Sequence, residues 1–502
     1  MHRCAVSCLA LMAATISFVP APLHAASIAP ISETQTTLPD RHTAFSEQLF
    51  RLPTRDGTIL EATLLLPHTA GPFPLAIVSG GASHISGSNH GARDRYDYLS
   101  GYFLDRGYAV LRPMARGFAG SEGRLISDGC ELATTARRNA DDIRDVSAAI
   151  AQLPDIDATR IVTAGLSFGG WVQMAMGTMP LPGTRAQFLF FPLMHVSSCH
   201  NDADRLLAGA SEFGAETHLP TLWVQGENDS LAPTESWKAM YAAYKAKNPQ
   251  AELVDVPPFL NDSHSLLNDP DGLRPWMAQA DAMLEKAGLP HRVVVADYLP
   301  TLPPPASGYA ELNDFSKLPV QNDMMRKAYQ TFLTQPTPKA FVIGDDAESV
   351  GAHDFDPISS ALSGCSKASQ NCRLYAYDNR VVWQGHGPSQ TRQQAITVSS
   401  GKVVSVFYSV INEDCTARYV PAIKLVKAPA HGALRMSTSA TGVTHHTVGP
   451  LTKCNTVPVK GSVLQYRSNP DFHGTDSVTI TKQVSADPKD PPITMTYLFT
   501  IN

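Results

Sequence analysis

The sequence predicts an α/β fold with a mostly parallel central sheet and helices on both faces, followed by a small α+β module and a C-terminal β-sandwich. Three observations support this fold class. Strand and helix patterns alternate up to about residue 290, as they do in parallel sheets. A Gly-x-Ser-x-Gly sequence at residues 165–169 lies directly between a strand pattern and a helix pattern. After residue 394, Val, Thr, Ser and Tyr dominate, and turn residues recur about every eight to twelve positions, which is typical of a β-sandwich.

The composition indicates a multidomain protein that does not bind nucleic acid. The chain has 502 residues, enough for about two or three domains of ~100–200 residues each. A formal net charge of −6 and a pI near 6.3 provide no basic surface for a nucleic acid. We therefore expect no nucleic-acid partner.

The amino terminus has the pattern of a cleaved signal peptide over residues 1–26. A weakly basic start at His2 and Arg3 precedes an apolar run over residues 5–19, and small residues follow it. The run is too short for a membrane-spanning helix. We expect an exported protein, either periplasmic or secreted.

Six cysteines remain once the signal peptide is removed. An even number in an oxidising compartment predicts disulfides, although six cysteines allow fifteen connectivities. A zinc site is the alternative, but the sequence contains no Cys-x-x-Cys or His-x-x-x-His spacing, so we expect no metal and no other cofactor. Their placement along the chain favours the pairs Cys130–Cys199, Cys365–Cys372 and Cys415–Cys454.

The Gly-x-Ser-x-Gly sequence has the flanks of a nucleophile elbow. A β-branched run at residues 160–164 precedes it, and residues 171–176 have helical composition. A strand that turns sharply into a helix at a serine is the elbow of an α/β-hydrolase, so Ser167 is the predicted nucleophile. The turn is so tight that side chains at Gly165 and Gly169 would clash. The amino end of the helix favours developing negative charge.

Before the elbow, the chain predicts a polar, disordered lead-in at residues 27–45 and then three strands. Asp-Gly at positions 56 and 57 is a strong turn signal between strands at residues 48–52 and 58–66. Residues 75–78 are continuously apolar, as in a buried parallel strand.

A Gly-rich loop follows the strand at residues 75–78. In an α/β-hydrolase this loop contributes one backbone N–H to the oxyanion hole, and the residue after the nucleophile contributes the other. We therefore expect the donors to be Phe168 and either Gly81 or Ala82.

Further helices are expected at residues 96–106 and 131–153, and further strands at residues 108–111 and 186–191. Residues 195–218 are polar and are predicted to be irregular. Because this segment is too short for a large cap domain, we expect an open, shallow site.

Two motifs together indicate a family. Residues 116–123 read Arg-Gly-x-x-Gly-Ser-x-Gly, and Gly-x-Ser-x-Gly-Gly follows at residues 165–170. This pair resembles secreted α/β-hydrolases of the dienelactone hydrolase-like group, and also peptidase and acyl-esterase relatives that share both motifs. The resemblance covers about residues 45–290. True dienelactone hydrolases carry a cysteine nucleophile where this chain has Ser167, so the resemblance implies the fold and not the dienelactone substrate.

The other two residues of a catalytic triad are predicted from strand ends. A strand at residues 219–225 leads into Gly-x-x-Asp, and a carboxylate there can orient a histidine ring, so Asp229 is the predicted acid. Glu227 is the alternative. The strand at residues 251–256 is followed by His264, the predicted base. The order Ser, Asp, His is that of α/β-hydrolases.

The chemistry is expected to end with a closing helix at residues 273–288. The Pro-rich residues 297–307 then predict a stiff linker and a domain boundary. A chain ending near Ala296 should therefore fold and remain active. The small α+β module is expected over residues 308–384, with helices at 321–334 and 357–362 and strands at 339–343 and 373–383.

The predicted β-sandwich covers residues 390–502. Residues 427–434 and 466–477 resemble strands and turns of bacterial cadherin-like and immunoglobulin-like surface domains. The resemblance implies attachment to the cell envelope or to a polymer. Asp471 and Asp476 alone are too few for a calcium shell, which takes six or more oxygens.

These features predict an exported serine hydrolase that acts on a small-molecule carboxylic ester and needs no cofactor. Ser167 would attack the carbonyl, His264 would transfer the proton, and Asp229 would hold the imidazole. One alternative is a serine peptidase of the prolyl-oligopeptidase kind, although the sequence shows neither a preceding propeller nor an acidic anchor for a substrate amine. The other is a non-catalytic surface or adhesion protein built on a hydrolase scaffold.

Overall fold

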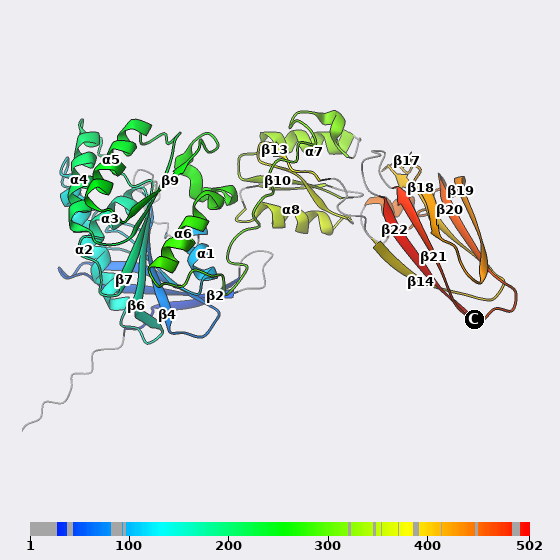
Figure 1. Ribbon diagram of the computed structural model, residues 1–502, viewed down its shortest axis with the longest axis horizontal. Helices are drawn as coiled ribbons and strands as arrows, with labels where there is room; N and C mark the ends of the chain where they lie inside the picture. Colours follow the sequence, from blue (N-terminus) through cyan, green and yellow to red (C-terminus); the bar gives the residue numbers. More distant parts are fainter. Residues whose placement is uncertain are drawn as a thin grey trace, which may run out of the picture.

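The computed structural model confirms the predicted fold class, with three parts that follow one another along the chain (Figure 1). It describes residues 28–37, 44–81, 93, 97–319, 323–344, 348–352, 354–369, 371–384, 391–412, 414–446, 450–483 and 492–502. The predicted signal peptide, residues 1–26, and Ala82 lie outside the described residues. Within those residues, no helix is both long enough and apolar enough to cross a membrane.

A nine-stranded sheet in the order β1-β2-β3-β5-β4-β6-β7-β8-β9 forms the centre of the α/β part. The pairs from β1 to β5 along this order are antiparallel, and all pairs from β5 to β9 are parallel. The carboxyl ends of β4 to β9 therefore meet at one edge of the sheet. The strands are Ser32–Thr37 (β1), Ala44–Pro53 (β2), Ile59–Pro67 (β3), Phe73–Ser79 (β4), Ala109–Pro113 (β5), Ile156–Leu166 (β6), Thr184–Phe190 (β7), Thr221–Gly226 (β8) and Ala251–Val256 (β9).

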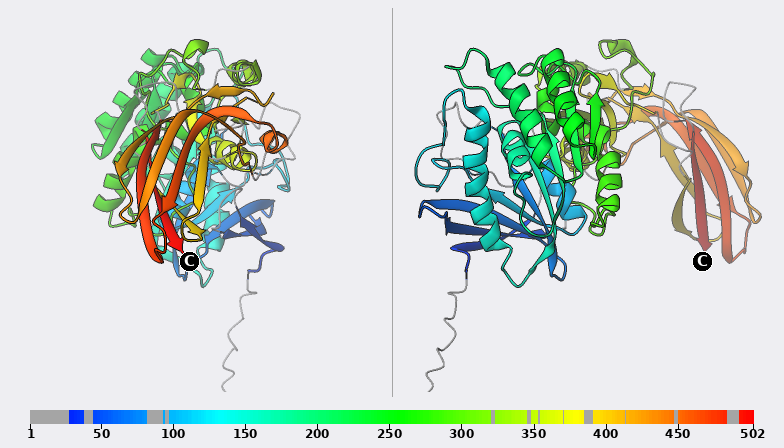
Figure 2. Two further views of the ribbon diagram at one scale, coloured as in Figure 1. Left: turned by 90° about the vertical axis from the view of Figure 1, so that its right-hand side faces the viewer. Right: turned by 60° about the vertical axis from the view of Figure 1, so that its left-hand side comes forward.

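Helices cover both faces of this sheet (Figure 2). Each face carries its own apolar cluster, one containing Trp171 and Trp237 and the other Tyr102 and Trp276. Burial of these apolar side chains on both faces is the main driving force for this part of the fold. One face packs α2 (Leu132–Ile150), α3 (Phe168–Met176), α4 (Asp202–Glu216) and α5 (Thr234–Lys247), and the other packs α1 (Tyr98–Asp105) and α6 (Arg274–Lys286).

Two predictions for the α/β part are wrong. Residues 27–45 are not wholly irregular, because Ser32–Thr37 forms strand β1 and pairs with β2. Residues 195–218 are not irregular either, because Asp202–Glu216 forms helix α4. In both cases tertiary packing overrides a polar composition: β1 completes a sheet edge, and α4 buries Leu206 and Phe213 against its neighbours.

The small α+β module contains a four-stranded sheet, β11-β10-β12-β13, and two helices. The single strand predicted at residues 373–383 is wrong, because a turn at Asp378 divides it into two strands, and strand β11 was not predicted. The elements are α7 (Asp323–Thr334), β10 (Lys339–Ile343), β11 (Glu348–Ala352), α8 (Pro357–Ser366), β12 (Arg373–Tyr377) and β13 (Arg380–Val381).

The β-sandwich contains a four-stranded sheet, β14-β22-β21-β18, and a three-stranded sheet, β15-β20-β19, and β16 and β17 form a separate two-stranded sheet. Asp476 is structural here, since its carboxylate accepts hydrogen bonds from the backbone N–H of Ala430 and His431 and from the hydroxyl of Tyr466. The strands are Thr391–Val398 (β14), Val403–Tyr408 (β15), Val410–Ile411 (β16), Ala417–Tyr419 (β17), Ala422–Lys427 (β18), Gly432–Gly442 (β19), Val459–Ser468 (β20), Gly474–Gln483 (β21) and Ile493–Ile501 (β22).

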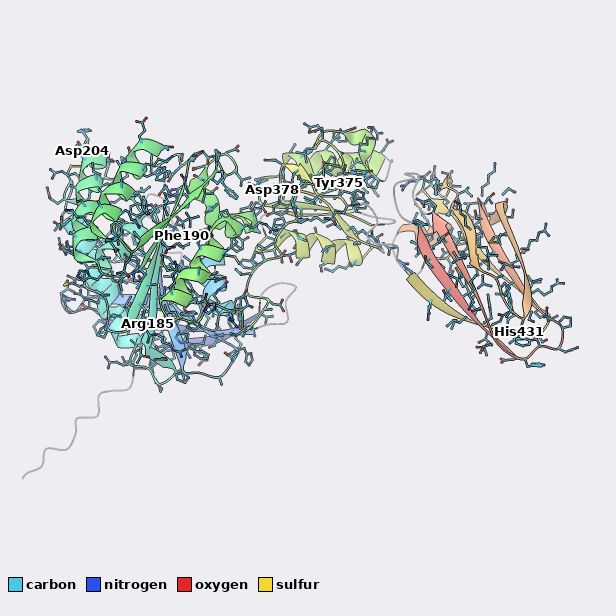
Figure 3. The ribbon with its side chains drawn as sticks, viewed as in Figure 1. Arg185, Phe190, Asp204, Tyr375, Asp378 and His431 are labelled. Atoms are coloured by element: carbon cyan, nitrogen blue, oxygen red, sulfur yellow. A yellow bond between two sulfur atoms is a disulfide. The ribbon has the colours of Figure 1, made fainter. Side chains whose placement is uncertain are left out.

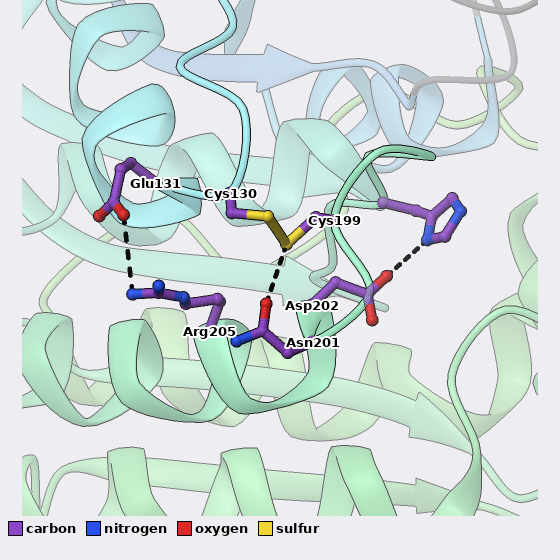
Figure 4. Close-up of a disulfide and its surroundings, with 7 residues drawn as sticks. Cys130, Glu131, Cys199, Asn201, Asp202 and Arg205 are labelled. Atoms are coloured by element: carbon purple, nitrogen blue, oxygen red, sulfur yellow. Dashed lines mark hydrogen bonds and ion pairs between the residues drawn. A yellow bond between two sulfur atoms is a disulfide. The ribbon is translucent and has the colours of Figure 1, made fainter.

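The structure pairs the six cysteines as predicted. Figure 4 shows the Cys130–Cys199 disulfide, which ties the start of α2 to the segment between β7 and α4. Beside it, Arg205 Nη1 lies 3.7 Å from Glu131 Oε1. The two cysteines are 69 residues apart. In the chain-entropy model a closed loop of that length stabilises the fold by about 4 kcal/mol.

The Pro-rich stretch at residues 297–307 is not a free linker. Tyr298 is fully buried in the second apolar cluster of the α/β part. Its hydroxyl donates to the carbonyl of Ala44 (2.7 Å), and its backbone N–H donates to the Asp105 carboxylate (2.9 Å). The polypeptide therefore leaves the α/β part later than the proline pattern predicts.

A chain ending at Ala296 should consequently be less stable than one ending at Gln384. Removing a fully buried aromatic side chain costs about 3–5 kcal/mol, which lowers the Tm of a domain this size by roughly 10 °C. Thermal unfolding of both truncated chains measures the difference, and the full-length Tyr298→Ala variant provides the matched control. Equal Tm values for the two truncated chains would contradict the role assigned to Tyr298.

Candidate active site

Ser167 occupies a sharp turn between β6 and α3. Its backbone has φ 55° and ψ −122°, a conformation that residues with a side chain rarely adopt. A Cβ on Gly165 would lie 2.3 Å from the carbonyl oxygen of Gly169, and a Cβ on Gly169 would lie 2.3 Å from that of Ser79. Only glycine fits at either position, as the elbow pattern predicts.

Gly81 lies against the candidate nucleophile. A Cβ built on Gly81 would be 3.3 Å from the Cβ of Ser167. The register explains this approach, since Ser79 at the end of β4 pairs with Gly165 at the end of β6. Phe168 begins α3, where backbone N–H groups have no partner within the helix. The two described candidate oxyanion donors thus flank Ser167 from different elements.

Asp229, in the segment after β8, accepts hydrogen bonds from three donors. Its Oδ1 accepts from the backbone N–H groups of Leu231 (2.9 Å) and Ala232 (3.3 Å). Its Oδ2 accepts from Nε2 of Gln225 (2.6 Å). The side chain is fully buried. These three hydrogen bonds stabilise the charged carboxylate and fix the orientation of the Asp229 side chain.

His264 meets this carboxylate through Nδ1, which lies 3.1 Å from Oδ1 and 3.2 Å from Oδ2 of Asp229. The imidazole is 15% exposed. A carboxylate can only accept a hydrogen bond, so the pairing assigns the proton to Nδ1 and leaves Nε2 as an acceptor. Such an imidazole is poised to take a proton from a neighbouring group.

The end of β7 connects Ser167 with His264. The N–H of Ser167 donates to the carbonyl of Phe190 (2.8 Å), and the N–H of Leu193 donates to the carbonyl of Ser167 (3.3 Å). Between them, the ring of Phe191 packs edge-on against the imidazole of His264, with centroids 5.4 Å apart. The structure thus brings all three predicted residues to one edge of the sheet, whereas exposed Glu227 points elsewhere, 4.0 Å from Lys238.

Asp262 is a site residue that the sequence reasoning missed. Its Oδ1 accepts from the backbone N–H of His264 (2.9 Å) and of Ser230 (3.1 Å), and its Oδ2 accepts from the Ser230 hydroxyl (2.6 Å). Burial raises the pKa of Asp262, but the hydrogen bonds from Ser230 and His264 outweigh it and hold the pKa below its usual range. An Asp two residues before a loop histidine is a capping pattern that could have indicated this role.

A pocket opens beside Gly81 and Phe168, between the ends of β4 and β5 and helices α2 and α3. Its apolar lining comes from Met114, Phe118, Ile143 and Val172, and its polar lining includes Asn139 and Asp142.

Arg116 neutralises the acidic group of this pocket. Its guanidinium binds both carboxylate oxygens of Asp142, at 2.6 and 2.7 Å. Arg116, the first residue of the Arg-Gly motif, therefore has a structural role: it fixes the segment after β5 to helix α2. In the same motif, the Ser121 hydroxyl accepts from the backbone N–H of Glu61 (2.9 Å).

Comparison with known proteins finds a family model that matches part of this region. A family model for X-Pro dipeptidyl-peptidase of the S15 family matches residues 56–211, which contain both Gly-rich motifs and Ser167. The α/β part has the α/β-hydrolase fold.

Two curated relatives are both named esterase FrsA. The protein from Citrobacter koseri is 28% identical over 151 residues, which are 30% of this chain and 32% of the relative. The protein from Escherichia coli O157:H7 is 27% identical over 141 residues, 28% of this chain and 30% of the relative. The chain thus matches about a third of the length of these relatives.

Similar solved structures include an esterase and a peptidase. The Pyrococcus furiosus esterase Pf2001 is 15% identical, with a TM-score of 0.37, over 52% of this chain and 98% of that chain. Dipeptidyl peptidase 4 from Porphyromonas gingivalis is 18% identical, with a TM-score of 0.38, over 48% of this chain and 35% of that chain.

Proposed function

We propose that this protein hydrolyses carboxylic esters through an acyl-enzyme on Ser167. The observation that carries the proposal is the contact of His264 Nδ1 with both oxygens of Asp229, at the edge of the sheet where the elbow presents Ser167. A buried carboxylate, an oriented imidazole and a serine in this order are the parts of a nucleophilic hydrolase.

In the first step, Ser167 Oγ attacks the ester carbonyl carbon while Nε2 of His264 takes the hydroxyl proton. The negative charge that develops on the carbonyl oxygen is stabilised by the backbone N–H groups of Phe168 and Gly81. His264 then returns the proton to the departing alcohol. Water repeats the sequence on the acyl-enzyme, releasing the carboxylic acid and restoring Ser167.

Two observations favour an ester over a peptide substrate. Both curated relatives are named esterases. The acidic group in the pocket, Asp142, is bound on both oxygens by Arg116, so it is not available to anchor a substrate amine. The pocket is otherwise largely apolar, which suits the acyl group of an ester.

A dipeptidyl-peptidase is the second candidate because the S15 family model covers the elbow.

The deciding experiment compares p-nitrophenyl acetate with an Xaa-Pro p-nitroanilide on the full-length protein. We expect kcat/KM to be at least about a hundredfold higher for the ester, together with labelling of Ser167 by a fluorophosphonate. Faster release from the anilide would establish the peptidase instead. The absence of both turnover and labelling would indicate a non-catalytic scaffold.

Asp262 should act as a positioning residue for this reaction. Asp262→Ala removes the acceptor that joins the His264 and Ser230 segments, and displacement of a catalytic group by about 1 Å can cost roughly a hundredfold. We expect kcat to fall by about ten- to a hundredfold with little change in KM. Asp262→Asn should restore most of the activity because its oxygen can still accept both backbone N–H bonds. Asp255→Ala, an exposed carboxylate on β9, is the matched control. A loss equal in Asn and Ala variants would contradict the capping role.

We also infer export and surface attachment. Three disulfides support residence in an oxidising compartment, and the β-sandwich offers a separate surface for a cell-envelope or polymer partner. The mass of the mature chain recovered outside the cytoplasm checks the export, since cleavage of residues 1–26 would shorten it.

A further inference from the structure

The α/β part and the small module meet at a group of three carboxylates. Asp269 and Asp271 follow the segment that carries His264, and Asp378 occupies the turn between β12 and β13 of the module. One carboxylate oxygen from each lies within 4.8 Å of the other two. Figure 3 labels Asp378 on the side of the module that faces the α/β part.

Two of these carboxylates are buried almost completely. Asp269 is 2% exposed and Asp378 is 1% exposed. Each has one oxygen that accepts hydrogen bonds from donor groups. Oδ1 of Asp269 accepts from the backbone N–H of Asp271 (2.8 Å) and the hydroxyl of Tyr377 (3.1 Å). Oδ1 of Asp378 accepts from the backbone N–H of Lys339 (2.8 Å).

Apart from a hydrogen bond between the two carboxyl groups themselves, their second oxygens have no partner. Among the described residues, Oδ2 of Asp269 and Oδ2 of Asp378 are buried and receive no other hydrogen bond. A buried carboxylate oxygen without a donor is costly, and two facing each other add charge repulsion. These atoms point to a positively charged partner between them, either a shared proton or a bound cation.

The nearby basic side chains do not serve as that partner. Arg380 Nη1 binds Oδ2 of Asp271 at 2.5 Å, on the third carboxylate of the group. The Lys339 ammonium donates instead to the carbonyls of Leu333 and Gln335. Within the described part of the chain, neither Asp269 nor Asp378 forms an ion pair with a basic side chain.

We propose that Asp269, Asp271 and Asp378 bind a calcium ion that joins the small module to the α/β part. The ligands would be the two unpartnered oxygens and one carboxylate oxygen of Asp271. The donors are oxygens only, which suits a hard cation and not zinc or copper. Calcium tolerates irregular geometry with added waters, whereas magnesium demands a near-ideal octahedron. Because Asp269 lies five residues after His264, the ion would also anchor the segment that carries the base.

The experiment measures calcium binding and thermal unfolding of the full-length protein. After treatment with EGTA and desalting, we expect isothermal titration to show a Ca²⁺ site that depends on Asp378. At a hundredfold excess over Kd, Ca²⁺ should raise the Tm by about 5–10 °C. Mg²⁺ should have a smaller effect.

Two variants locate the ion. Asp378→Asn and Asp269→Asn should both abolish this Ca²⁺ site and its Tm increase. In EGTA each variant should unfold at or above the temperature of the unsubstituted protein, because one of two facing charges is removed; this outcome also shows that the variants fold. Asp204→Asn, an exposed residue on α4 labelled in Figure 3, should bind Ca²⁺ as the unsubstituted protein does.

Three results would overturn the proposal. The first is the absence of Ca²⁺ binding and of any Tm increase in the unsubstituted protein. The second is an undiminished Tm increase in Asp378→Asn, which would place the ion elsewhere. The third is a Tm that ignores Ca²⁺ but falls as pH rises from 6 to 9, which would identify a proton shared between Asp269 and Asp378.

Discussion

Replacing Ser167 with alanine should lower kcat for ester hydrolysis by about a millionfold, the loss typical of a serine nucleophile. The residual rate would come from the oxyanion donors and substrate binding. The Tm should hardly change, because alanine and serine both carry a Cβ and meet the same strain at φ 55°. Activity assays and thermal unfolding on the same sample measure both quantities.

The control for this variant is Ser198→Ala, at an exposed serine in the segment after β7. It should keep full activity and full fluorophosphonate labelling. A Ser167→Ala protein that kept more than about a hundredth of the activity would show that another residue attacks the carbonyl.

Replacing Asp229 with asparagine should lower kcat by about ten-thousandfold. The asparagine amide would donate to Nδ1 of His264, so the proton of the ring would move to Nε2, the nitrogen that has to accept the Ser167 proton. The variant should fold, since Leu231 and Ala232 can still donate to the remaining oxygen and the Gln225 amide can turn to accept. Steady-state kinetics and circular dichroism test these two expectations.

Glu227→Gln is the matched control for Asp229→Asn. It changes the same functional group two residues earlier, but Glu227 is exposed and lies near Lys238, away from His264. We expect near-normal kcat. If Glu227→Gln were the damaging change and Asp229→Asn mild, the acid of the triad would be misassigned.

The site could be predicted to the extent that its signals are local. The elbow depends on backbone clashes at Gly165 and Gly169, which involve the turn and the strand beside it, so a five-residue pattern reveals it. Asp229 and His264 follow strand ends, and the carboxyl ends of parallel strands share one edge. Asp262 and Gln225 were missed because capping and support of a buried carboxylate have weak sequence signals.

The predictions of secondary structure were wrong where polar segments are ordered by contacts with residues far away in the sequence. Strand β1 exists because it pairs with β2, and helix α4 because Leu206 and Phe213 find a core on α2 and α3. Tyr298 is buried by contacts with Ala44 and Asp105, which lie about 190 to 250 residues away. The proline pattern carries no information about such contacts, so the linker was predicted to begin too early in the chain.

The sequence by itself determined the α/β-hydrolase fold class and the candidate nucleophile, because hydrophobic periodicity and turn chemistry are properties of short segments. Only the tertiary structure decided how Asp229 is held, which pocket lies beside Gly81 and Phe168, and that Asp269, Asp271 and Asp378 converge. These features join residues that are far apart in the chain. Their energies come from burial and from distances between side chains, and both exist only once the parts have packed together.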